Sequence, residues 1–168
     1  VELLYSKRPC KYTVIIAGDG RQKHSMERLG EEVVRRCSGV SIEFPGWLNE
    51  KEKSLAFERS SVFAMPNLWP EPLGMAPLEA LCHGVPVVGF DGGFAEYVVE
   101  GITGRIVTGE RNVHLFTEAL EDCLLDEKIK KHAQLQAKDL RQRLSVSVHT
   151  ELLLGQLQSI LDSLPNNF

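Results

Sequence analysis

The stretch at residues 66–86 reads PNLWPEPLGMAPLEALCHGVP, and it predicts a turn that leads into a helix. Two carboxylates, Glu71 and Glu79, flank this turn with seven residues between them. Pro72 and Gly74 lie in the turn, and the helix is expected to start near Gly74. A helix start presents free backbone N–H groups and the positive end of the helix dipole, which favour a phosphate group. A carboxylate at each end of the turn can accept hydrogen bonds from sugar hydroxyl groups.

Strand and helix signals alternate on both sides of this stretch, and this order predicts an α/β fold with a mainly parallel sheet. Short apolar runs rich in β-branched residues predict strands at 12–17, 40–44, 61–65, 85–90 and 105–107. Apolar residues at spacings of three and four predict helices at 25–37, 49–59 and 77–83, with a short helix at 93–99. The helical spacing continues beyond residue 107, so a helical C-terminal tail is expected.

The composition is that of a soluble globular domain, with 168 residues and a net charge of −4. This charge gives no electrostatic reason to expect nucleic acid as a partner. The four cysteines form no C-x-x-C pair, and the five histidines have no metal-ligand spacing. No apolar run is long enough to cross a bilayer. The sequence therefore predicts a cytoplasmic protein with reduced thiols, no metal site and no integral membrane segment.

Several further motifs follow one another in a fixed order around the two glutamates. Residues 15–20 read IIAGDG, and residues 44–48 read FPGWL. The motifs GVPVV, DGGFAE and GITG come later, at 84–88, 91–96 and 101–104. In this order the motifs resemble retaining glycosyltransferases of the GT-B fold in family 4, over roughly residues 10–125. The resemblance implies a Rossmann-like parallel sheet flanked by helices, the C-terminal donor-binding lobe of such an enzyme.

The resemblance also implies a substrate and roles for individual residues. The donor would be a nucleotide diphosphate-sugar (a UDP-, GDP- or ADP-sugar). Its sugar would be transferred with retention of the anomeric configuration, and no cofactor would be required. Glu71 would be the catalytic residue that contacts hydroxyl groups of the transferred sugar. The N–H groups of Gly74, Met75 and Ala76 would bind the distal phosphate and the sugar. Glu79 would accept hydrogen bonds from both ribose hydroxyl groups.

Three more residues are candidates for donor binding, each with an ordinary structural alternative. Gly18 and Gly20 follow the first predicted strand, where a turn can bring backbone close to a ligand. A plain strand-to-helix turn is the alternative, and Lys23 replaces the third glycine of a dinucleotide-binding fingerprint. Trp47 follows Gly46 at a strand end and is a candidate to stack on the nucleobase. The alternative is that Trp47 packs on the edge of its own sheet.

One part of the family pattern is not found. The donor-binding lobe of this family opens with a strand and a turn bearing Gly-Arg and Lys-Gly elements, which contact the diphosphate. Residues 1–5 resemble the helix after that turn, and Lys7, Arg8 and Lys11 lie past the required position. The resemblance thus implies that residues 1–168 form a single donor-binding domain without its first strand and without the N-terminal acceptor lobe. We expect an unpaired apolar sheet edge and little transferase activity from this chain alone.

The acceptor, a glycan, a lipid or a small molecule, would bind through that other lobe, as would any membrane surface. The chain would then be a fragment or one partner of a split enzyme. Leu152, Leu153 and Leu154 form either an exposed apolar face toward the other lobe or a local core. Two other functions stay open: a non-catalytic nucleotide-binding or scaffolding module, and a lobe like that of sugar-nucleotide epimerases.

Overall fold

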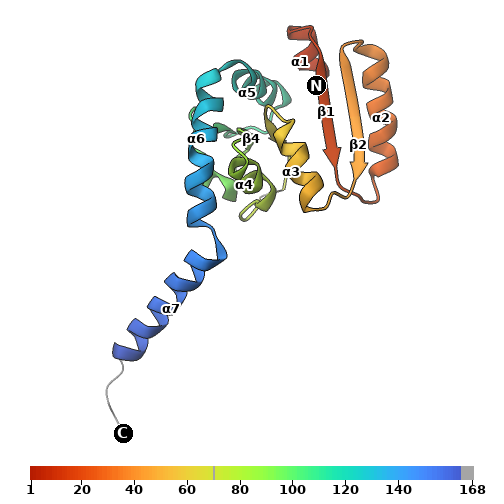
Figure 1. Ribbon diagram of the computed structural model, residues 1–168. Coiled ribbons are helices and arrows are strands. Elements are labelled where there is room, and N and C mark those ends of the chain that lie inside the picture. Colours follow the sequence, from red (N-terminus) through yellow and green to blue (C-terminus); the bar gives the residue numbers. More distant parts are fainter. Residues whose placement is uncertain (70, 164–168) are drawn as a thin grey trace.

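A computed structural model describes residues 1–69 and 71–163, in which helices and strands alternate as predicted (Figure 1). The first half contains α1 (Glu2–Lys7), β1 (Tyr12–Ala17), α2 (Lys23–Arg36), β2 (Val40–Gly46), α3 (Glu50–Glu58) and β3 (Phe63–Met65). The second half contains α4 (Met75–Cys82), β4 (Val87–Phe90), the 3₁₀ turn η1 (Gly93–Glu96), β5 (Gly104–Val107), α5 (Val113–Leu125), α6 (Glu127–Arg143) and α7 (Val146–Ser163). The five predicted strands are confirmed, whereas the short helix expected at 93–99 is only the 3₁₀ turn η1.

The strands pair in parallel, as predicted, but they form two sheets. β1 pairs with β2 in one sheet, and β4 lies between β3 and β5 in the other. Within the described part of the chain, β1 has no strand partner besides β2, and β3 has none besides β4. Within the described residues β1 and β3 thus each have an unpaired edge, and the expected apolar character of such an edge stays a prediction. The absence of the family's first strand, which would explain that edge, stays a prediction.

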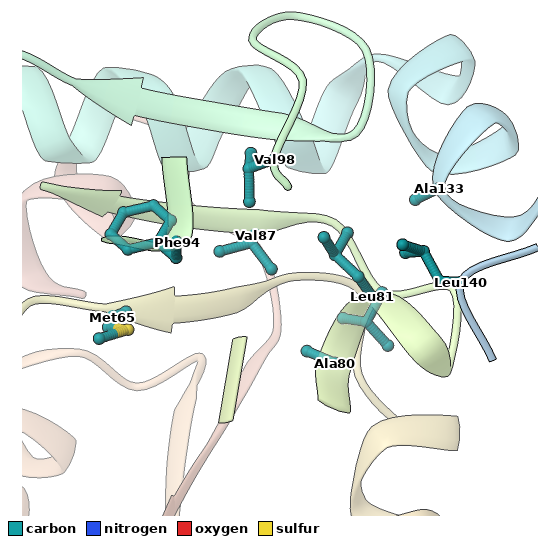
Figure 2. Close-up of a cluster of buried hydrophobic side chains, with 9 residues drawn as sticks. Met65, Ala80, Leu81, Val87, Phe94, Val98, Ala133 and Leu140 are labelled. Carbon is teal, nitrogen blue, oxygen red and sulfur yellow. The ribbon is translucent and has the colours of Figure 1, made fainter. Parts of the chain in front are cut away.

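The main hydrophobic core surrounds β4, all four residues of which are buried. Figure 2 shows side chains from β3, β4, α4 and α6 in one cluster, with Met65, Val87, Leu81 and Leu140 among its members. A second cluster on the α5 side joins Val88, Phe90 and five more buried residues, which are Val107, Phe116, Ala119, Cys123 and Ile129. The first of these clusters fixes α4 against the sheet through Ala80 and Leu81, so the start of the helix is held in place by the core.

Two local features position the elements that carry the candidate site. The side chain of Asn49 accepts a hydrogen bond from the Glu52 N–H, and the Glu52 carboxylate accepts one from the Asn49 N–H. This capping box fixes the first turn of α3. After the C-terminal end of α4, Gly84 adopts φ +75°, a left-handed conformation that glycine tolerates well after a helix.

The last helix, α7, extends away from the rest of the molecule (Figure 1). Leu152, Leu153 and Leu154 are 61%, 49% and 59% exposed, so they form no local core. Of the two alternatives for this leucine block, the exposed apolar face is the one observed. Among the helices that the structure describes, none combines the length and the apolar character needed to cross a membrane.

Candidate functional site

The start of α4 is not capped by a side chain in the described structure, and Met75 and Ala76 are exposed there, whereas Gly74 itself is buried. Gly74 precedes the helix with φ +76°, in the left-handed region. A Cβ on Gly74 would lie 2.9 Å from Pro77 Cγ, so a larger residue would be crowded there as well as strained. Met75 is 59% exposed, which places the helix start at the surface. The N–H groups of Met75 and Ala76 belong to the first turn, where no partner exists within the helix.

The loop that carries Glu71 is pinned from the opposite side by the segment after β4. The Gly93 N–H donates a hydrogen bond to the carbonyl oxygen of Glu71 at 2.7 Å. A Cβ on Gly93 would lie only 1.8 Å from the carbonyl oxygen of Pro72, so the two segments are in direct backbone contact. The contact with Gly93 thus fixes the backbone position of Glu71.

Tyr97 contacts the same loop at residues closer to the start of α4. Its hydroxyl donates to the Leu73 carbonyl oxygen at 2.7 Å and also lies against the Gly74 carbonyl oxygen. Burial, together with the negative charge of Glu71, raises the pKa of Tyr97 above its ordinary value. The phenol therefore remains protonated at neutral pH and keeps its capacity to donate.

Glu79 lies one turn into α4, with its side chain 36% exposed. Its neighbours Ala80 and Leu81 are fully buried in the core, so the face of α4 that carries Glu79 is fixed. Lys53 Nζ of α3 donates to Glu79 Oε2 at 3.0 Å and also lies 2.9 Å from Glu50 Oε1. Hydrogen bonds to Glu50 and then Glu79 raise the pKa of Lys53, so its ammonium group stays charged at neutral pH.

The two glutamates therefore belong to one helix start, with Glu71 before it and Glu79 within it. Glu79 is five positions after Gly74, about 7.5 Å along the helix axis. This spacing places Glu79 about one turn from the N–H groups of Met75 and Ala76 at the helix start. The arrangement can bind a phosphate and hydroxyl groups on both sides of it.

The predicted turn after β1 lies beside the end of β2. The Gly18 N–H donates to the Gly46 carbonyl oxygen at 2.7 Å, and Gly18 has φ +123°. A Cβ on Gly18 or Gly20 would have no atom within 4 Å, so this turn faces open space.

Trp47 is 83% exposed, and the alternative that it packs on its own sheet edge is therefore wrong. Its ring is free to contact a ligand.

Two residues near the site, Lys53 and Tyr97, were not predicted from the sequence. Gly93 lies in a quoted motif, but its contact with the Glu71 loop depends on tertiary packing. Among the residues that the structure describes, no three or more His, Cys, Asp or Glu side chains are grouped to hold a metal ion.

Known proteins are similar to this chain in sequence and in fold. The family model for glycosyl transferases group 1 matches residues 3–140. A GDP-mannose-dependent monoacylated alpha-(1-6)-phosphatidylinositol monomannoside mannosyltransferase from Corynebacterium glutamicum is 30% identical over 90% of this chain and 39% of its own length. The chain spans about a third of the first curated relatives that it matches, 32% and 39% of their lengths.

Solved structures agree with this assignment. Anabaena Alr3699/HepE in complex with UDP-glucose matches with a TM-score of 0.65 and 25% identity, over 94% of this chain and 44% of that protein. Sucrose-phosphate synthase from Thermosynechococcus elongatus, at 19% identity, shares the fold with a TM-score of 0.70 over 95% of this chain and 41% of its own. The chain therefore belongs to the glycosyl transferases group 1 family and has the fold of one lobe of a GT-B glycosyltransferase.

Proposed function

We propose that this chain is the donor-binding lobe of a retaining glycosyltransferase and binds a nucleotide diphosphate-sugar at the start of α4. The observation that carries the proposal is the helix start without a side-chain cap, where Met75 and Ala76 are exposed, with Glu71 before it and Glu79 within it. The relatives add support, since one is named as GDP-mannose-dependent and one was solved with UDP-glucose.

In this proposal each part of the donor has its own contact. Glu71 accepts hydrogen bonds from hydroxyl groups of the transferred sugar, and Glu79 accepts them from the two ribose hydroxyl groups. The N–H groups of Gly74, Met75 and Ala76 bind the distal phosphate. These groups stabilise the negative charge that develops when the nucleoside diphosphate leaves, and they require no metal ion to do so.

Two further contacts complete the proposed donor site. The open turn at Gly18 and Gly20 brings backbone close to the donor, and the exposed Trp47 ring stacks on the nucleobase. We assign no nucleophile, because the proposed reaction is a same-face attack guided by the leaving phosphate.

We infer that the acceptor binds to a second lobe, because the match to this chain covers only 32% and 39% of the length of the relatives. The 168-residue chain alone would then bind donor but transfer little or no sugar. The four free cysteines fit a cytoplasmic location, with any membrane contact made through the second lobe.

Calorimetric titration of the full chain with UDP, GDP and ADP tests this function. At least one should bind, and Glu79→Gln should weaken that nucleotide about tenfold, the effect of losing one charge-assisted hydrogen bond. The matched control is Glu151→Gln, an exposed glutamate on α7, which should leave the affinity unchanged. A folded chain that binds none of the three would instead favour a non-catalytic scaffolding role. With a protein that contains both lobes, an assay with a radioactive donor distinguishes sugar transfer to an acceptor from epimerisation of the donor.

A further inference from the structure

Lys53 makes a contact that the roles assigned above do not use. It joins α3 to α4 through the Glu79 carboxylate, across a sequence separation of 26 residues. The Lys53 side chain is 28% exposed, so most of it is packed rather than free in solvent. The capping box at Asn49 and Glu52 fixes the turn from which Lys53 projects.

The contact is specific in the atoms that it uses. Lys53 Nζ lies 3.0 Å from Glu79 Oε2, which accepts its hydrogen bond. A carboxylate has about four lone-pair positions on two oxygens, so one ammonium donor leaves most of its acceptor capacity for a ligand. The side chain of Glu79 is 36% exposed, which keeps that remaining capacity within reach of solvent or a ligand.

Ribose recognition makes a strict demand on this carboxylate. Two neighbouring hydroxyl groups must donate to one side chain, so the carboxylate plane must have a fixed direction. A glutamate without a partner samples several rotamers, and fixing it at the moment of binding costs conformational entropy. A charged donor already in place removes part of that cost before the ligand arrives.

We propose that Lys53 is a positioning residue that orients the Glu79 carboxylate for the ribose diol of the donor nucleotide. The inference rests on the proposed function, because it assumes that Glu79 binds the ribose. Lys53 acts through Glu79 and touches no atom of the nucleotide. Glu50 is the second acceptor of the same ammonium group at 2.9 Å, but its side chain is 92% exposed and it serves only as a competing partner.

The test compares a nucleoside diphosphate with its 2′,3′-dideoxy counterpart by calorimetry, using whichever base the full chain binds. The ratio of the two Kd values reports ribose recognition alone, since both ligands carry the same base and diphosphate. We expect a ratio of about ten or more for the unmodified chain and a ratio near one for Glu79→Gln. Lys53→Met should lower the ratio at least threefold, and Lys53→Arg should restore most of it.

Controls separate a positioning role from a general effect of charge or stability. Lys130→Met removes another lysine that pairs with a glutamate three residues earlier and has a 33% exposed side chain, and it should leave the ratio unchanged. Glu50→Gln should also keep the ratio, because it leaves the contact with Glu79 intact. In the double variant, Lys53→Met should add little to Glu79→Gln, since both act on one contact. Thermal unfolding by circular dichroism verifies that each variant is folded.

The possible failures are distinct. If Lys53→Met weakens both ligands equally and the ratio persists, Lys53 contacts the diphosphate and the inference is wrong, although the proposed function stands. If Lys53→Met changes neither affinity, the inference is also wrong. If the unmodified chain itself shows a ratio near one, the assignment of Glu79 to the ribose fails, and the inference fails with it.

Discussion

Replacing Gly93 by alanine should disturb the sugar end of the site more than the nucleotide end. Gly93 is outside the left-handed region, so alanine fits its backbone and only space opposes it. The added Cβ would lie 1.8 Å from Pro72 O, 2.2 Å from Pro72 C and 2.7 Å from Leu73 N. Contacts below 3.0 Å with backbone atoms cannot be relieved by a rotamer change, so the Glu71 loop must move by more than an ångström.

The expected cost follows from this geometry. Overpacking of this kind costs about 1–3 kcal/mol, and loss of the Gly93–Glu71 hydrogen bond adds about 1 kcal/mol. A displacement of about 1 Å at a binding group can lower a rate or affinity by as much as about 100-fold. Because Ala80 and Leu81 anchor α4 in the core, Glu79 should move less than Glu71.

The assay measures the affinity of Gly93→Ala for a nucleotide diphosphate-sugar and for the matching nucleoside diphosphate. We expect the sugar nucleotide to lose about tenfold or more, and the nucleoside diphosphate to lose clearly less. Gly155→Ala is the matched control, since a Cβ there meets no atom within 4 Å. Equal losses for both ligands, or no loss in a folded variant, would refute the reasoning about the loop.

Three other changes have expected outcomes. Tyr97→Phe removes the hydroxyl that holds Leu73, so the free energy of unfolding in urea should fall by about 1 kcal/mol; an unchanged midpoint would mean that the hydroxyl holds nothing. Trp47→Ala should weaken nucleotide binding while the melting temperature stays constant, because the ring is 83% exposed; a large drop in melting temperature would show that the ring packs in the fold. Burial raises the pKa of the Cys123 thiol from 9.0 to about 12. The folded chain therefore binds more protons than the unfolded chain between these values, and stability that is complete below pH 9 is lost as the pH rises toward 12. Urea unfolding at pH 8 and pH 10 should show a smaller alkaline loss for Cys123→Ala, and an equal loss in both proteins would contradict this.

Features set by neighbouring residues could be predicted from the sequence. The helix predicted at 49–59 was found as α3, and its capping box depends only on Asn49 and the residue three positions later. The strands were located because short apolar runs end at turn residues such as Gly18 and Gly84. The position of Glu71 and Glu79 around the start of α4 follows from the same local rules.

Contacts between distant segments could not be predicted in this way. Lys53 and Glu79 are 26 residues apart, and Tyr97 and Leu73 are 24 residues apart. Whether such side chains meet depends on how α3 and η1 pack against α4, which no local pattern encodes. The two sheets also escaped prediction, because strand periodicity gives the face of a strand but not its partners.

The sequence also did not determine which apolar side chains would be buried and which would be exposed. Leu153 and Trp47 have the residue types of a core, yet they are 49% and 83% exposed. Apolar character predicts burial only when a partner surface exists. The structure decided between alternatives that the sequence left open.

The most direct test of the central claim is a nuclear magnetic resonance titration of the ¹⁵N-labelled full chain with UDP, GDP and ADP. If the start of α4 binds the diphosphate, the backbone amides of Gly74, Met75 and Ala76 should shift most, and amides of α7 should not move. Saturable binding with shifts that leave these three amides unchanged would contradict the account, as would a folded chain that responds to none of the nucleotides.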